Sequence, residues 1–184
     1  MMLITPAQLA DQPLLLNETV PESTIDYTPD IRQLGPLTLN GKAELIVEHR
    51  GSKEFVEDIR LRAHFEGTFE LLCARCLEPV MTPLAGDFDL IYRPAGVEAE
   101  SGERAISEDE TEIGYYEKSG LLLEDAVREQ VLLSLPGRAL CQEECKGLCP
   151  QCGVNRNTTH CNCADAPADP RWSALAGLSA GDKA

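Results

Sequence analysis

The chain has 184 residues, of which 43% are apolar and 26% are charged, proportions typical of a globular protein with a buried core. Its 16 Lys and Arg residues face 31 Asp and Glu residues, so the formal net charge is −15. A field of that sign repels phosphate backbones, which disfavours non-specific nucleic-acid binding and makes a basic protein an easier partner. No apolar run approaches the roughly 20 residues of a membrane span. The N-terminus also lacks the basic-then-apolar order of a secretory signal, so we expect a cytoplasmic protein with no membrane partner.

Repeated prolines interrupt residues 1–36, which we expect to form an irregular N-terminal segment with at most a short strand at residues 14–16. From Leu37 onward, apolar and polar residues alternate along several runs. The apolar members of these runs are Ala43, Leu45, Val47, Ile59, Leu61, Ala63, Phe65, Phe69, Leu71, Cys73, Phe88, Leu90 and Tyr92. Alternation with a period of two predicts an antiparallel β-sheet with one face on the core and the other in water.

The strongest helical pattern covers residues 122–135, where apolar side chains recur at helical spacing on one side. Glu124 and Asp125 lie in the first turns, where carboxylates interact favourably with the helix dipole. Pro136 and Gly137 end the helix. We expect this helix to pack against the sheet.

These elements predict an α+β fold, an antiparallel sheet packed by one main helix, within a core domain at residues 37–136. Residues 93–112 have no periodicity and many acids, which predicts an acidic loop, and Ile113 with Tyr115 favours one more short strand. A cysteine-rich, zinc-binding tail at residues 137–163 and a flexible C-terminus at residues 164–184 complete the chain.

The chain contains eight cysteines, which are clustered rather than scattered. Two of them form the pair Cys73 and Cys76. The other six lie close together in the tail, at Cys141, Cys145, Cys149, Cys152, Cys161 and Cys163. In a chain without a secretory signal, clustered cysteines indicate metal binding or redox chemistry rather than disulfides.

Structural zinc is held by four thiolate or imidazole ligands in a tetrahedron. Cys149, Cys152, Cys161 and Cys163 form the first predicted site, because a C-x-x-C knuckle is followed by a loop long enough to fold back. The other four, Cys73, Cys76, Cys141 and Cys145, form a possible second site if the turn after the third strand meets the end of the helix. Two alternatives remain open: Cys141 or Cys145 could join the tail site, and His160 could replace Cys161.

A catalytic function is not expected. The Cys73/Cys76 pair has the spacing of a redox motif, but Pro79 and Pro83 prevent the long helix that follows such a motif in thioredoxin-like proteins. No nucleophile elbow, phosphate-binding loop or dinucleotide-binding pattern occurs. We therefore predict a protein that is not an enzyme and has no small-molecule substrate.

Three strings of the sequence together resemble the YceD family of large ribosomal RNA subunit accumulation proteins. They are CARCLEP at residues 73–79, VREQVLLSLP at residues 127–136 and CKGLCPQCGVNRN at residues 145–157. The resemblance covers residues 34–163. It implies a non-enzymatic factor needed for synthesis, processing or accumulation of 23S rRNA in large-subunit biogenesis. The implied partner is a precursor of the large subunit, contacted through rRNA or a basic ribosomal protein.

Five cations are candidate contacts for RNA or for another partner: Arg60, Arg62, Arg75, Lys146 and Arg156. The alternatives that involve no partner are a solvated strand face for Arg60 and Arg62, and a turn hydrogen bond for Arg75. Asn155 and Asn157, inside the predicted zinc loop, are either polar contacts or turn formers. The alternative function is a zinc-stabilised protein-interaction module unrelated to ribosomes.

Overall fold

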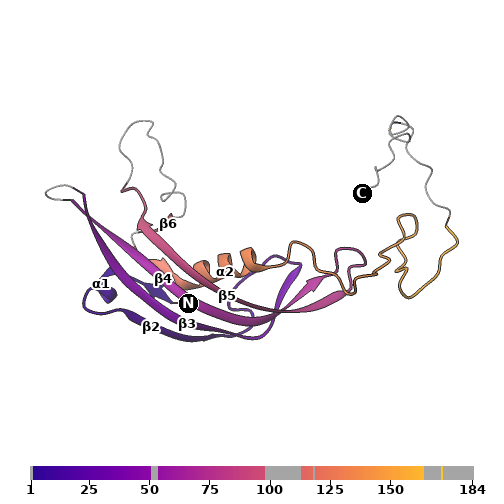
Figure 1. Cartoon of the computed structure of the whole chain (residues 1–184), viewed down its shortest axis with the longest axis horizontal. Coiled ribbons are helices and arrows are strands. Elements are labelled where there is room, and N and C mark those ends of the chain that lie inside the picture. The colour runs from indigo at the N-terminus through magenta and orange to yellow at the C-terminus, as the bar shows by residue number, and fades with distance from the viewer. Residues whose placement is uncertain (1, 51–53, 98–112, 118, 164–170, 172–184) are drawn as a thin grey trace, which may run out of the picture.

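The computed structural model describes residues 2–50, 54–97, 113–117, 119–163 and 171. An elongated, curved sheet is built from long strands, and the cysteine-rich tail extends beyond one end of it (Figure 1). In chain order the elements are β1 (Leu3–Ile4), α1 (Pro6–Leu9), β2 (Leu14–Val20), β3 (Ile31–Arg50), β4 (Glu54–Leu72), β5 (Pro79–Pro94), β6 (Ile113–Tyr116), β7 (Leu121–Leu122) and α2 (Leu123–Ser134).

The main sheet has the strand order β2-β3-β4-β5-β6, and β1 pairs with β7 in a separate two-stranded sheet. Strands β2 to β5 form an antiparallel meander. Leu61 of β4 lies opposite Ala43 of β3 on one side and opposite Leu90 of β5 on the other. The predicted alternation sorts apolar and polar side chains onto opposite faces of the sheet, because residues two apart lie on the same face of a strand. The long strands therefore carry one apolar and one polar face.

The core lies between the apolar face of the sheet and α2. Phe65 and Phe69 are its largest fully buried side chains, and Val127 and Val131 of α2 are fully buried as well. Helix α2 packs on β5. Pro136 follows Leu135, whose backbone is already extended at φ −64° and ψ 142°, and this ends the helix where the sequence predicts.

Two expectations about the sheet need correction. Strand β6 pairs with β5 in parallel, from Ile113 opposite Ile91 to Tyr116 opposite Pro94, so the sheet is mixed rather than purely antiparallel. Residues 1–36 are not irregular, because β2 is a full strand of the sheet and β3 already begins at Ile31. The prolines lie between strands or at the bulge of β3 around Pro36, where a missing N–H is tolerated.

Part of the predicted acidic loop at residues 93–112 belongs to the sheet, because β5 continues to Pro94. The acidic run from residue 98 to residue 112 lies outside the described residues, as does the predicted flexible C-terminus at residues 164–184 apart from Arg171. Within the described part of the chain, no helix combines the length and the apolar character needed to cross a membrane.

Candidate metal centres

The structure brings the eight cysteines together as two groups of four. The first centre comprises Cys73, Cys76, Cys141 and Cys145, and the second comprises Cys149, Cys152, Cys161 and Cys163. Within each centre the four sulfurs lie within 4.8 Å of one another. All eight cysteines are free thiols, so neither centre is a pair of disulfides.

The turn between β4 and β5 positions the first two thiols. The amide of Cys73 donates to the carbonyl of Glu78 at 2.8 Å, and the amide of Leu77 donates to the carbonyl of Cys73 at 2.9 Å. Leu77 has a positive φ of 62°, which closes the turn tightly after the C-x-x-C sequence. Cys73 and Cys76 are 0% and 4% exposed, so their sulfurs point into the protein rather than into water.

The segment after α2 runs beside this turn and supplies the other two thiols. The amide of Ala74 donates to the carbonyl of Ala139 at 2.9 Å, and the amide of Leu148 donates to the carbonyl of Arg75 at 3.0 Å. The Arg75 guanidinium in turn donates to the carbonyl oxygens of Glu143 at 3.1 Å and Cys145 at 2.7 Å. These bonds hold the tail against the end of the sheet, and they place Cys145 3.8 Å from Cys73, sulfur to sulfur.

The second centre is built within the tail itself. The amide of Gly153 donates to the carbonyl of Cys149 at 2.9 Å, and Gly153 has a φ of 73°, a conformation that glycine adopts without strain. The amide of Cys149 donates to the carbonyl of Val154 at 2.8 Å, which closes the knuckle. Cys161, rather than His160, completes the group of four.

Asn155 and Asn157 connect the two centres. The amide side chain of Asn157 donates to the sulfur of Cys145 at 3.2 Å and to the side-chain oxygen of Asn155 at 2.9 Å. Asn155 donates to the carboxylate of Glu78 at 3.1 Å, on the turn that carries the first two thiols. The sequence left polar contacts and turn formation as alternatives, and both occur, because the backbone amide of Asn157 also donates to the side-chain oxygen of Asn155 at 3.0 Å. The only signal was the position of both asparagines directly after the Cys149/Cys152 knuckle.

Backbone amides help to stabilise thiolates in both centres. Burial alone raises the pKa of Cys73, but hydrogen bonds from the backbone of Cys141, Arg75 and Cys76 outweigh it and lower the pKa to about 6. Backbone hydrogen bonds from Cys152 and Gln151 lower the pKa of Cys149 to about 6 as well.

Other thiols in the same centres are shifted in the opposite direction. Burial, together with the neighbouring thiols, raises the pKa of Cys141 to about 12. Hydrogen bonding with Cys152, followed by burial, raises the pKa of Cys163 to about 12. Four crowded sulfurs cannot all carry a negative charge on their own, and a bound divalent cation removes this restriction.

The geometry of the donors fits a tetrahedral metal ion. A zinc–sulfur bond of about 2.3 Å implies sulfur–sulfur edges of about 3.8 Å in a regular tetrahedron. The Cys73–Cys145 sulfur distance is 3.8 Å and the Cys76–Cys141 sulfur distance is 3.5 Å. Each centre can therefore hold one metal ion, and an all-thiolate donor set is compatible with zinc.

The candidate cations divide into two groups. Arg60 donates to Asp89 at 2.8 and 2.6 Å, and Arg62 donates to Glu44 at 2.6 Å, so the strand face is neutralised by its own carboxylates. Arg75 is engaged with the two carbonyls described above. Lys146 and Arg156 are exposed, and the described residues place no ion pair or side-chain hydrogen bond on either of them.

The fold and the two centres define a protein with a mixed, mostly antiparallel sheet and two four-cysteine groups. A family model described as "Large ribosomal RNA subunit accumulation protein YceD" matches residues 61–179, a stretch that includes both centres. The chain belongs to the YceD family.

Among relatives, uncharacterized proteins of Mycobacterium bovis and Mycobacterium tuberculosis are 34% identical over 104 residues. The aligned region is 56% of this chain and 47% of each relative, so the chain spans about half the length of these relatives. No solved structure matches the chain.

Proposed function

We propose that this protein is a non-enzymatic, cytoplasmic factor for 23S rRNA accumulation, acting by binding a precursor of the large ribosomal subunit. The observation that carries the proposal is the family match over residues 61–179, because that family is described as an rRNA accumulation protein and not as a catalyst. The proposal covers synthesis, processing and stabilisation of 23S rRNA, which the test below separates.

Zinc is the metal that we assign to both centres, with a structural role. The support is the all-cysteine donor set and the sulfur–sulfur distances near a tetrahedral edge. We also propose residues 37–136 as the core domain and residues 137–163 as the metal-binding tail. In this arrangement the first centre fastens the tail to the core, because Cys73 and Cys76 lie in the turn between β4 and β5.

The test is deletion of the gene in the organism that encodes the protein, followed by measurement of mature 23S relative to 16S rRNA. We expect the ratio to fall, and a tagged protein to co-sediment with precursors of the large subunit. Pulse labelling of rRNA separates reduced synthesis from faster decay, and mapping of the 23S ends detects a processing defect. An unchanged ratio together with a normal polysome profile would refute the proposal.

A co-sedimentation test also addresses the alternative of a zinc-stabilised interaction module unrelated to ribosomes. That module would migrate away from ribosomal particles at all salt concentrations. If instead the protein follows precursor particles and is retained after the rRNA is digested, contact through a basic ribosomal protein is favoured.

A further inference from the structure

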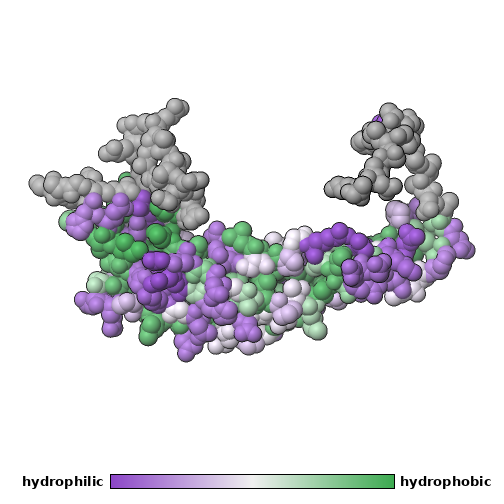
Figure 2. Space-filling model, in the orientation of Figure 1, coloured by the Kyte–Doolittle hydropathy of each residue, from purple (hydrophilic) through white to green (hydrophobic). Residues whose placement is uncertain are grey.

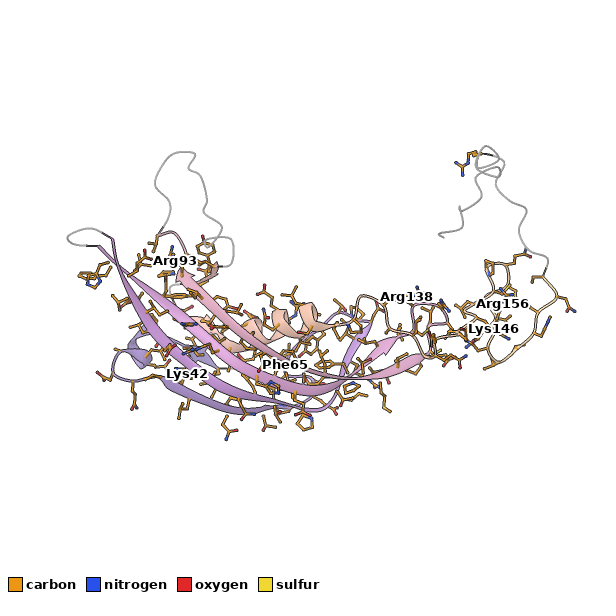
Figure 3. The ribbon with its side chains drawn as sticks, in the orientation of Figure 1. Lys42, Phe65, Arg93, Arg138, Lys146 and Arg156 are labelled. Carbon is orange, nitrogen blue, oxygen red and sulfur yellow. The ribbon has the colours of Figure 1, made fainter. Side chains whose placement is uncertain are left out.

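A pocket lies beside the second metal centre at the outer end of the tail. Its volume is about 250 Å³, and its wall includes Cys149, Cys161 and Cys163 together with Lys146, Arg156 and His160. No Asp or Glu is among the described residues that line it. The labelled side chains of Lys146 and Arg156 lie at this end, far along the molecule from Lys42 and Arg93 (Figure 3).

The basic side chains of the pocket come from separate parts of the tail, and the fold brings them together. Lys146 directly follows a ligand of the first centre, and Arg156 lies beyond the knuckle of the second. The amide of Arg156 donates to the carbonyl of Gly147 at 2.9 Å, which holds the two segments side by side. Asn157 also accepts a hydrogen bond from the amide of Lys146 at 2.8 Å.

The charge pattern of this pocket differs from that of the sheet face. The sheet face pairs its cations with carboxylates, as in the Arg62–Glu44 contact at 2.6 Å. Residues 137–163 contain three Lys or Arg residues and two carboxylates, in a chain of net charge −15. Hydrophilic side chains gather over this end of the molecule (Figure 2). Lys146 and Arg156 therefore share this pocket with thiols of the second centre and with no Asp or Glu of the described residues.

We infer that the Lys146/Arg156/His160 pocket binds a backbone phosphate of RNA. This inference rests on the proposed function, which supplies rRNA as the source of the phosphate. Arg and Lys are the side chains that neutralise phosphates, and a guanidinium can make two parallel hydrogen bonds to phosphate oxygens. A pocket that reaches one or two phosphates makes binding nearly independent of base sequence.

The experiment uses the full-length protein purified with its metal and a fluorescent fragment of 23S rRNA. Lys146→Gln and Arg156→Gln are made singly and together, and Arg138→Gln is the matched control. Arg138 is an exposed cation of the same tail that does not line the pocket. Binding is measured by fluorescence anisotropy over a series of salt concentrations, and zinc is counted by elemental analysis.

We expect the double variant to bind the fragment about tenfold more weakly, equally for unrelated RNA sequences. We expect the slope of log affinity against log salt to become shallower by about 0.7 to 0.9 for each phosphate contact that is lost. Arg138→Gln should change neither quantity.

Three outcomes would overturn the inference. Equal loss of affinity in Arg138→Gln would mean that only the overall charge of the tail matters. Loss of zinc from the double variant would show that these cations balance thiolate charge at the second centre. Unchanged RNA binding in the double variant would refute the assignment of this pocket as a phosphate site. If deletion of the gene nevertheless lowers the ratio of 23S to 16S rRNA, the proposed function still stands.

Discussion

The side-chain amide of Asn157 lies 3.2 Å from the sulfur of Cys145, so a residue from the loop of the second centre contacts a ligand of the first. This hydrogen bond is the largest cause of the lowered pKa of Cys145. Through Asn155, the same network reaches Glu78 on the turn of the sheet. The two centres are thus linked by hydrogen bonds through Asn155 and Asn157.

Replacing Asn157 with alanine should weaken metal binding at the first centre. The sulfur of Cys145 would lose a donor that stabilises its thiolate, and losses of outer hydrogen bonds of this kind reduce metal affinity by about 10- to 100-fold. Competition with a chromogenic zinc chelator measures the effect. Asn17→Ala, on the exposed part of β2, is the control and should leave affinity unchanged. Equal affinities in both variants would show that the contact with sulfur has no energetic role.

Cys152→Ser and Cys76→Ser should have different consequences, although each removes one thiol. Cys152 is exposed and belongs to the centre within the tail, so its loss should lower the metal content from two ions to one and leave the sheet folded. Cys76 is buried and joins the tail to the sheet, so its loss should also lower the thermal midpoint of the core. Elemental analysis and calorimetry measure both quantities. Complete loss of cooperative unfolding in Cys152→Ser would show that the core domain does not fold independently of the tail at residues 137–163.

Arg93→Ala should destabilise the fold strongly. Arg93 and Asp58 are 5% and 4% exposed, and the guanidinium donates to both carboxylate oxygens at 3.1 and 2.8 Å. Removing one partner of a buried ion pair typically costs about 3 to 5 kcal/mol of unfolding free energy, because the other charge remains buried. Chemical denaturation measures this free energy.

Two further variants make the Arg93 test specific. Arg60→Ala breaks the ion pair with Asp89 on the wet face, and it should have a much smaller effect because that face is solvated. The double variant Arg93→Met with Asp58→Leu should recover much of the lost stability, since no charge of the pair is left buried. Equal destabilisation by Arg93→Ala and Arg60→Ala would contradict the assigned burial.

Tyr92→Phe should remove part of the loss of stability at alkaline pH. Burial, with smaller contributions from Glu129 and Asp125, raises the pKa of Tyr92 to about 12. In the unfolded chain a tyrosine titrates near pH 10, so between about pH 10 and 12 the folded state binds more protons and stability falls as pH rises. Across this window the unfolding free energy of the unmodified protein should fall more steeply with pH than that of Tyr92→Phe, and below it the two should change in parallel. A pH slope identical in the variant would show that Tyr92 ionises freely.

The sheet illustrates what a local pattern can predict. Alternation placed Ile59, Leu61 and Phe65 on one face, and all three are buried. Alternation gives no direction to a short strand, however, so β6 was expected in an antiparallel sheet and is parallel to β5. Strand β2 was missed beyond its first residues because its later residues, Asn17 to Thr19, are polar and exposed at the edge of the sheet.

The metal centres likewise have a part that the sequence predicts and a part that it leaves open. The Cys149/Cys152 knuckle and its following loop are close in sequence, so spacing was enough to predict that these thiols meet. The grouping of Cys141 and Cys145 with the β4–β5 turn depended on whether two distant segments touch, and spacing left that open. Arg156 and Lys146 could be named as cations, but their convergence on one pocket depends on the backbone bond between residues 156 and 147.

The wide separation of the first centre's thiols along the chain has a consequence for biosynthesis. Cys76 precedes its partner Cys141 by 65 residues, and Cys73 precedes Cys145 by 72. At about 5 to 20 residues per second, the ribosome needs roughly 3 to 14 seconds to add that length. During this interval the nascent chain presents two thiols without their partners, and the ions captured by such a pair are held weakly. The second centre, whose thiols all lie within the tail, emerges complete within about 3 seconds of its first cysteine. Translation therefore leaves Cys73 and Cys76 without partners until the tail is made, and the first centre has all four thiols only shortly before the second does.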